Sequence, residues 1–142
     1  MGSHDRRTRI LVALLRLTGG VIITAFLAIF LPVDWMASAH RALGLGEFPR
    51  APVVDYLARS IAALYGFHGV LLLLLSRDPI RYRSIVSYVG IMNILFGVIV
   101  LAIDLHAGLP MWWTLLEGPP VVMCGVLITA LNRPAGSVLH AI

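Results

Sequence analysis

Three ionisable residues stand where a charge is costly, because Arg59, Asp104 and Glu117 each lie inside a long apolar stretch of the chain. A charge in such surroundings is stable only when it faces protein or water and has a partner of opposite sign. One arginine and two carboxylates could form an ion-pair lock that joins three helices. The same groups could instead bind a small ligand or carry a proton, and both interpretations stay open.

A second set of polar residues, Arg16, His68 and Asn93, also interrupts the apolar stretches. Because histidine is the usual axial ligand of a haem, His68 marks the candidate site for a haem or a quinone. Its alternative role is that of a structural hydrogen-bonding residue. The single cysteine, Cys124, excludes a pair of cysteines for redox or zinc chemistry. The sequence thus assigns no catalytic residue and no metal ligand.

The run Glu117-Gly118-Pro119-Pro120 is the strongest local anomaly. Two prolines remove two backbone donors, so the helix that contains them is predicted to kink or break there. A helix that restarts at Pro119 would direct its positive amino end at Glu117. Broken helices beside carboxylates hold ions or substrates in transporters. A re-entrant cap on a structural bundle would explain the same residues.

The composition indicates which elements must position these residues. Of the 142 residues, 59% are hydrophobic and 13% are charged, against roughly 25% charged in an average soluble domain. Four apolar stretches are long enough to cross a hydrocarbon core of about 30 Å as helices, and these are residues 10–31, 53–76, 85–107 and 111–131. The predicted fold is all-α, an integral membrane four-helix bundle in a single domain over residues 1–142.

The arginines orient this bundle. Seven of them fall at the two ends of the chain and between the second and third stretches, whereas the other two connections hold only Arg41 and Arg50. Arginine-rich connections stay in the cytoplasm, so both termini are predicted to be cytoplasmic. Trp35, Trp112 and Trp113 fall at the opposite boundary, in agreement with the preference of indole rings for the headgroup layer.

Depth and helical rotation bring the charged residues together in this topology. Arg59, Asp104 and Glu117 are expected about 6 to 10 Å below the outer surface, so Arg59 is predicted to pair with Asp104, Glu117 or both. Asn93 and Gly97 share a helical face with Asp104, and a small residue marks the packed side of a membrane helix. Asp55 and Gly66 share a face with Arg59 in the same way.

The second polar layer, Arg16, His68 and Asn93, is expected about 9 to 12 Å from the inner surface, where His68 points away from Arg59. The only long connection, residues 32–52, is predicted to hold a short helix on the membrane surface. Asp34 is expected to cap its start and Gly44 to end it.

Several segments resemble the small four-helix membrane proteins of the DoxX-like group, including its uncharacterised bacterial relatives. They are Leu57-Ala58-Arg59 through Gly69, the leucine run after it, Arg77-Asp78-Pro79, and Phe96-Gly97, and the resemblance covers about two thirds of the chain. It implies a multi-pass protein of the bacterial inner membrane, and some members of the group are subunits of quinone-linked oxidoreductases. The stretch that contains Trp112, Trp113 and Glu117 belongs to no pattern of that group.

Three classes of function fit these residues. The first is a non-catalytic accessory or assembly subunit of the bacterial inner membrane, which needs no cofactor and whose charge cluster locks its own fold. The second is a membrane oxidoreductase subunit with a haem or a quinone near His68, and the third is a small homodimeric transporter that uses Glu117. The expected partners are the lipid bilayer and either a second copy or a larger membrane complex. Because the arginines are scattered, nucleic acid is not expected.

Overall fold

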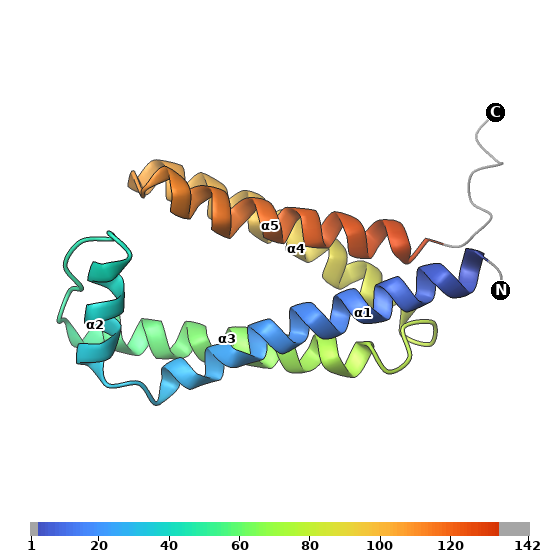
Figure 1. Cartoon of the computed structure of the whole chain (residues 1–142), viewed down its shortest axis with the longest axis horizontal. Coiled ribbons are helices and arrows are strands. Elements are labelled where there is room, and N and C mark those ends of the chain that lie inside the picture. Colours follow the sequence, from blue (N-terminus) through green and yellow to red (C-terminus); the bar gives the residue numbers. More distant parts are fainter. Residues whose placement is uncertain (1–2, 134–142) are drawn as a thin grey trace. The chain divides into compact units, whose positions relative to one another are not determined.

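The computed structural model describes residues 3–133, and the regular elements among them are all helical. In chain order they are α1 (Ser3–Ile23), the 3-10 helix η1 (Thr24–Ile29), α2 (Val33–Ala42), α3 (Pro52–Leu75), α4 (Arg83–Ala107) and α5 (Met111–Leu131) (Figure 1). The all-α fold class is thereby confirmed.

Four helical segments are long and apolar enough to cross a membrane, namely Asp5–Ile29, Pro52–Leu75, Arg83–Ala107 and Met111–Leu131. The four predicted stretches are confirmed, although the first begins at Asp5 and not at residue 10. Within their apolar windows only 17% to 28% of the residues are buried by the rest of the chain. Most of their side chains therefore need an apolar solvent, as expected of a multi-pass membrane protein.

The chain forms two compact units. The α4–α5 unit consists, in the described part of the chain, of residues 3–16 and 74–133, so it also holds the start of α1 and the end of α3. The α2–α3 unit consists of residues 17–73, which include η1, α2 and most of α3. The single-domain organisation stays a prediction.

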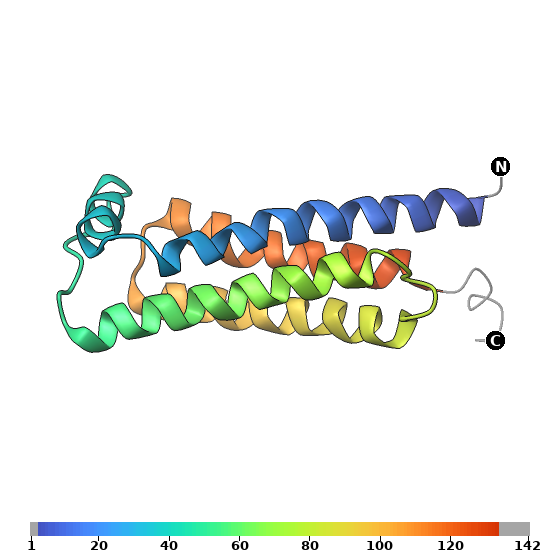
Figure 2. The ribbon, with the colours of Figure 1, turned by 90° about the horizontal axis from the view of Figure 1, so that it is seen from below.

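In the α4–α5 unit, α4 and α5 run antiparallel and lie side by side (Figures 1 and 2). Glycines bring the two backbones into contact. A Cβ atom added to Gly97 would lie 2.8 Å from the carbonyl oxygen of Gly118, and one added to Gly125 would lie 2.5 Å from that of Gly90. Close packing at small residues is a main source of helix association in lipid, because no hydrophobic force acts between helices there.

The face of α4 that the sequence predicts as its packed side is buried, including Asn93, Gly97 and Asp104. The two helices are joined through Gly108, whose φ of 68° lies in the left-handed region. The next backbone N–H, that of Leu109, donates to the carbonyl of Asp104 at 3.1 Å. Glycine ends α4 here because a side chain at this φ would be strained.

The helix α5 runs uninterrupted from Met111 to Leu131 with Pro119 and Pro120 inside it, so the predicted break is absent. A bend at the prolines stays a prediction. Membrane helices tolerate proline because neighbouring groups or small local adjustments satisfy the carbonyls that lose their donors. In hydrocarbon, leaving a helix would expose more unpaired backbone groups than the two hydrogen bonds that the prolines remove, so the helix continues through them.

In the α2–α3 unit, the second part of α1 packs against α3, again at glycines. A Cβ atom on Gly19 would lie 2.9 Å from the carbonyl oxygen of Gly69, and one on Gly69 would lie 2.7 Å from the backbone nitrogen of Ile23. Farther along, the rings of Phe26 and Phe67 meet edge to face with their centroids 5.3 Å apart. The close approach at the glycines holds α1 against α3, and the aromatic pair holds η1 against α3.

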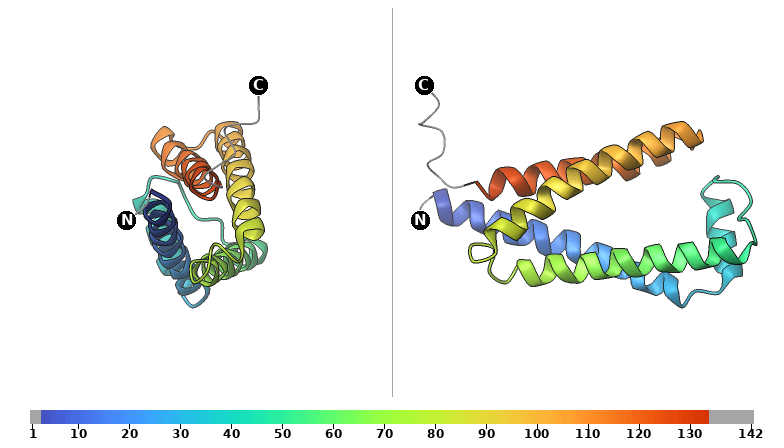
Figure 3. Two further views of the ribbon diagram at one scale, coloured as in Figure 1. Left: turned by 90° about the vertical axis from the view of Figure 1, so that its right-hand side faces the viewer. Right: turned by 180° about the vertical axis from the view of Figure 1, so that it is seen from behind.

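The predicted surface helix is present as α2, whose axis runs across that of α3 (Figures 1 and 3). The predicted cap is wrong. The helix begins at Val33, two residues earlier than a cap at Asp34 would place it, and the carbonyl of the preceding Pro32 accepts the N–H groups of Trp35 and Met36. Asp34 therefore lies within the first turn, and its carboxylate pairs with Arg50 at 2.9 Å. Gly44 follows the helix with a φ of 69°, as predicted for its end.

Replacing Gly125 by alanine should destabilise the α4–α5 unit, because the new methyl group would meet the backbone of Gly90. Overpacking of this kind costs about 1 to 3 kcal/mol, and the thermal unfolding temperature in detergent should fall accordingly. The matched control is Gly20→Ala, where the methyl group meets no atom within 4 Å. Because alanine favours helix, this variant should be as stable as the wild type or more stable. Equal losses in both variants would contradict the glycine contact.

Candidate functional site

Arg59, on α3, holds together three segments of the α2–α3 unit. Its Nε donates to Asp55 at 2.9 Å, one turn earlier on the same helix. One Nη group donates to the carbonyl of Ile29, and the other donates to that of Leu31 at 3.1 Å. The guanidinium therefore fastens α3 to the end of η1 and to the start of the connection that leads into α2.

These bonds have a clear physical cause. The last carbonyls of a helix have no partner within it, and η1 ends inside a stretch that is expected to be in hydrocarbon or at its edge. A guanidinium with five donors can satisfy one such carbonyl, that of Ile29, together with the carbonyl of Leu31 in the connection, and still hold a carboxylate. The four-residue spacing of Asp55 and Arg59 was a visible signal in the sequence. The carbonyl contacts had none, because no residue type marks where η1 ends.

Among the described ionisable residues of the α4–α5 unit, Asp104 is the most deeply buried, with 3% of its surface exposed. Its Oδ2 atom is enclosed and has no hydrogen-bond partner among the described residues. An unpaired buried carboxylate oxygen costs more than almost any other polar group. Among the described residues, this oxygen is the buried side-chain polar atom that lacks a hydrogen-bond partner.

Glu117, on α5, is half-buried and accepts a hydrogen bond from the indole Nε1 of Trp113, one turn earlier. The ring of Trp113 in turn meets that of Trp112 edge to face, with centroids 5.6 Å apart. Glu117 is also near enough to Asp104 to interact with it electrostatically. This interaction joins one carboxylate of each helix of the hairpin. The three-residue cluster stays a prediction.

The two carboxylates have no cation beside them in their own unit, since no described arginine of that unit forms an ion pair with either. Like charges held close together attract a cation or a proton. The pairing of Arg59 with Asp104 or Glu117 stays a prediction, because the arginine belongs to one unit and the carboxylates to the other.

The second polar layer is divided between the units. Arg16 is exposed on α1 and Asn93 is buried on α4, and both belong to the α4–α5 unit. His68 is half-buried on α3 in the other unit. The common layer and a haem or quinone site at His68 stay predictions. Among residues 3–133, no three side chains of His, Cys, Asp or Glu gather where they could hold a metal ion.

Comparisons of this chain with protein-family models, with curated proteins and with solved structures found no match. The resemblance to the DoxX-like group therefore rests on the sequence segments alone.

Double-mutant cycles on Arg59 measure which carboxylate it depends on. Arg59→Leu should lower the unfolding temperature in detergent by stranding Asp55 and two carbonyls. The cycle with Asp55→Leu should give a coupling of about 0.5 to 1 kcal/mol, as for other half-exposed pairs. If Arg59 also pairs with Asp104 or Glu117, Asp104→Leu or Glu117→Leu should restore part of the stability lost in Arg59→Leu, because breaking a buried pair costs about 3 to 5 kcal/mol.

The matched control for these cycles is Asp34→Leu, because Asp34 pairs with Arg50 and not with Arg59. Its effect should add to that of Arg59→Leu without coupling. Additive behaviour of both Asp104→Leu and Glu117→Leu would remove the predicted pairing.

Proposed function

We propose that this chain is a non-catalytic accessory or assembly subunit of the bacterial inner membrane. The observation that supports this proposal best is how the polar groups near the helix ends are used. Arg59 binds Asp55, the carbonyl of Ile29 at the end of η1 and the carbonyl of Leu31 in the connection after it. Asn132 donates to the carbonyl of Arg83 and to the hydroxyl of Ser87, both at 2.8 Å. These costly polar groups serve to join one segment to another.

The exposed surface supports the same proposal. Large apolar side chains are more than half exposed along every long helix, including Leu17, Leu64, Val98 and Leu116. A bilayer can cover such side chains, and so can the helices of a larger membrane protein. An accessory subunit would have some of these side chains covered by the bilayer and others by the helices of its partner.

A second candidate is a small transporter that works as a homodimer, and it rests on Asp104 and Glu117. The unsatisfied oxygen of Asp104 beside Glu117 is a place where a cation or a proton would be stabilised. The uninterrupted α5 weakens this candidate, because broken helices are the usual frame of such sites. An oxidoreductase subunit is a further alternative, favoured by His68, Tyr65 and the resemblance to the DoxX-like group.

Purification of the tagged chain from native membranes in mild detergent should yield a different protein in a constant ratio with it. The same partner should be recovered with Glu117→Gln, because the accessory role does not depend on the ionisation of that residue. Recovery of the chain only with itself would contradict the proposal. The transporter candidate would gain if, in addition, proton-linked uptake by reconstituted vesicles were lost in Glu117→Gln and kept in the exposed control Glu47→Gln.

A further inference from the structure

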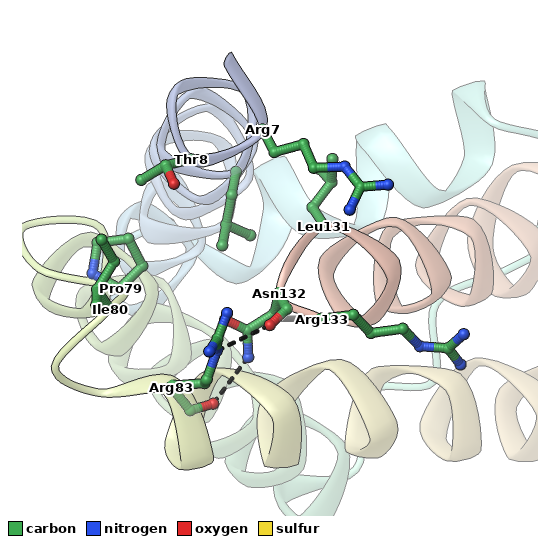
Figure 4. Close-up of a pocket in the computed structure, with 9 residues that line it drawn as sticks. Arg7, Thr8, Pro79, Ile80, Arg83, Leu131, Asn132 and Arg133 are labelled. Atoms are coloured by element: carbon green, nitrogen blue, oxygen red, sulfur yellow. Dashed lines mark hydrogen bonds between the residues drawn. The ribbon is translucent and has the colours of Figure 1, made fainter. Parts of the chain in front are cut away.

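The α4–α5 unit has a pocket at the end opposite to Asp104 and Glu117, lined by arginines (Figure 4). The start of α1, the connection before α4, and the residues that follow α5 each contribute to it. Its lining includes Arg7, Leu11, Pro79, Arg83, Asn132 and Arg133. All of these residues belong to one compact unit.

The charge of this pocket is uncompensated. In the described part of the chain, Arg7, Arg83 and Arg133 form no ion pair. The two acidic residues of this end are engaged elsewhere. Asp5 pairs with Arg9, and Asp78 accepts the backbone N–H of Arg81 at 3.0 Å. Three arginines from three segments thus line one pocket that has no carboxylate in its lining, and the side chains of Arg7 and Arg133 extend away from Arg83 (Figure 4).

Arg83 is held in a defined orientation there. Its Nε donates to the carbonyl of Asn132 at 3.0 Å, while the Asn132 amide donates back to the carbonyl of Arg83 (Figure 4). Asn132 is buried, at 4% exposure, and ties this arrangement to Ser87 as well. Because only Nε of Arg83 is used in these bonds, the Nη groups can donate to an anion. Arg7 and Arg133 are exposed at the rim.

We propose that this pocket binds a phosphate group, and that Arg83 grips it while Arg7 and Arg133 add charge at the rim. Guanidinium groups suit phosphate because their planar fork matches two of its oxygens. Basic pockets between membrane helices at the surface bind the headgroups of anionic lipids. The phosphate can belong to such a lipid or be free in solution, and the chemistry of the pocket is the same for both.

The proposal does not depend on the accessory function, since the pocket can bind a phosphate group whether or not the chain assembles with another protein. Binding of a phosphate group in this pocket also differs from the general attraction of arginines to an anionic membrane surface. A surface attraction depends on the number of arginines near the bilayer, whereas a pocket depends on which arginines they are. Two pairs of substitutions with equal loss of charge therefore separate the two explanations.

The test uses the full chain in nanodiscs of phosphatidylcholine, to which phosphatidylglycerol or inorganic phosphate is added in separate titrations. Binding is followed by the rise in unfolding temperature. The lining variant is Arg7→Gln with Arg133→Gln, and the matched control is Arg6→Gln with Arg77→Gln, two exposed arginines of the same end that do not line the pocket. Arg83 is left unchanged because its bonds to Asn132 support the fold.

The wild type should show saturable stabilisation by phosphatidylglycerol. The lining variant should bind about fivefold more weakly for each arginine removed, whereas the control should stay within about twofold of the wild type. Saturable binding of inorganic phosphate with the same dependence on Arg7 and Arg133 would also support the pocket and identify free phosphate as a ligand. Equal weakening in both variants, or no saturable effect of either probe on the wild type, would overturn the proposal.

Discussion

Hydrocarbon offers no hydrogen bonds, so every backbone polar group that enters it must find a partner within the protein. This constraint explains the main features of the chain. It favours four long helices, and it keeps α5 helical through Pro119 and Pro120 although two donors are missing. It also explains the position of Arg59, whose guanidinium satisfies the carbonyl of Ile29 at the end of η1 and that of Leu31 in the connection, where the helical bonding pattern stops.

The sequence predicts the helical framework well because hydrophobic length and glycine placement are local properties. The four apolar stretches and the buried face of α4 with Asn93, Gly97 and Asp104 follow from counting and from helical rotation. The start of α2 does not follow, because the cap is the backbone carbonyl of Pro32 and not the side chain of Asp34. The carbonyl partners of Arg59 are equally hidden, since backbone atoms leave no mark in a sequence.

Charge divides the α4–α5 unit into two ends of opposite sign. The carboxylates of Asp104 and Glu117 lie near the turn that joins the two helices, and the arginines of the pocket lie at the far ends of the same helices. Glycine contacts along the hairpin hold its two helices against each other between these ends. The hairpin thus has one acidic end, where Asp104 is buried and Glu117 is half-buried, and one basic end with exposed arginines.

The central claim, that α3 crosses the membrane, follows from its length and composition, and the arginines predict that the connection before it is outside and the one after it is in the cytoplasm. Single cysteines at Glu47 and Ile80, both exposed, test it directly in a Cys124→Ala background with a maleimide that does not cross membranes. We expect labelling of Glu47→Cys from the periplasm of otherwise intact cells, and of Ile80→Cys only after the inner membrane is permeabilised. Labelling of both positions from the same side would mean that α3 does not span the bilayer, and would contradict the account.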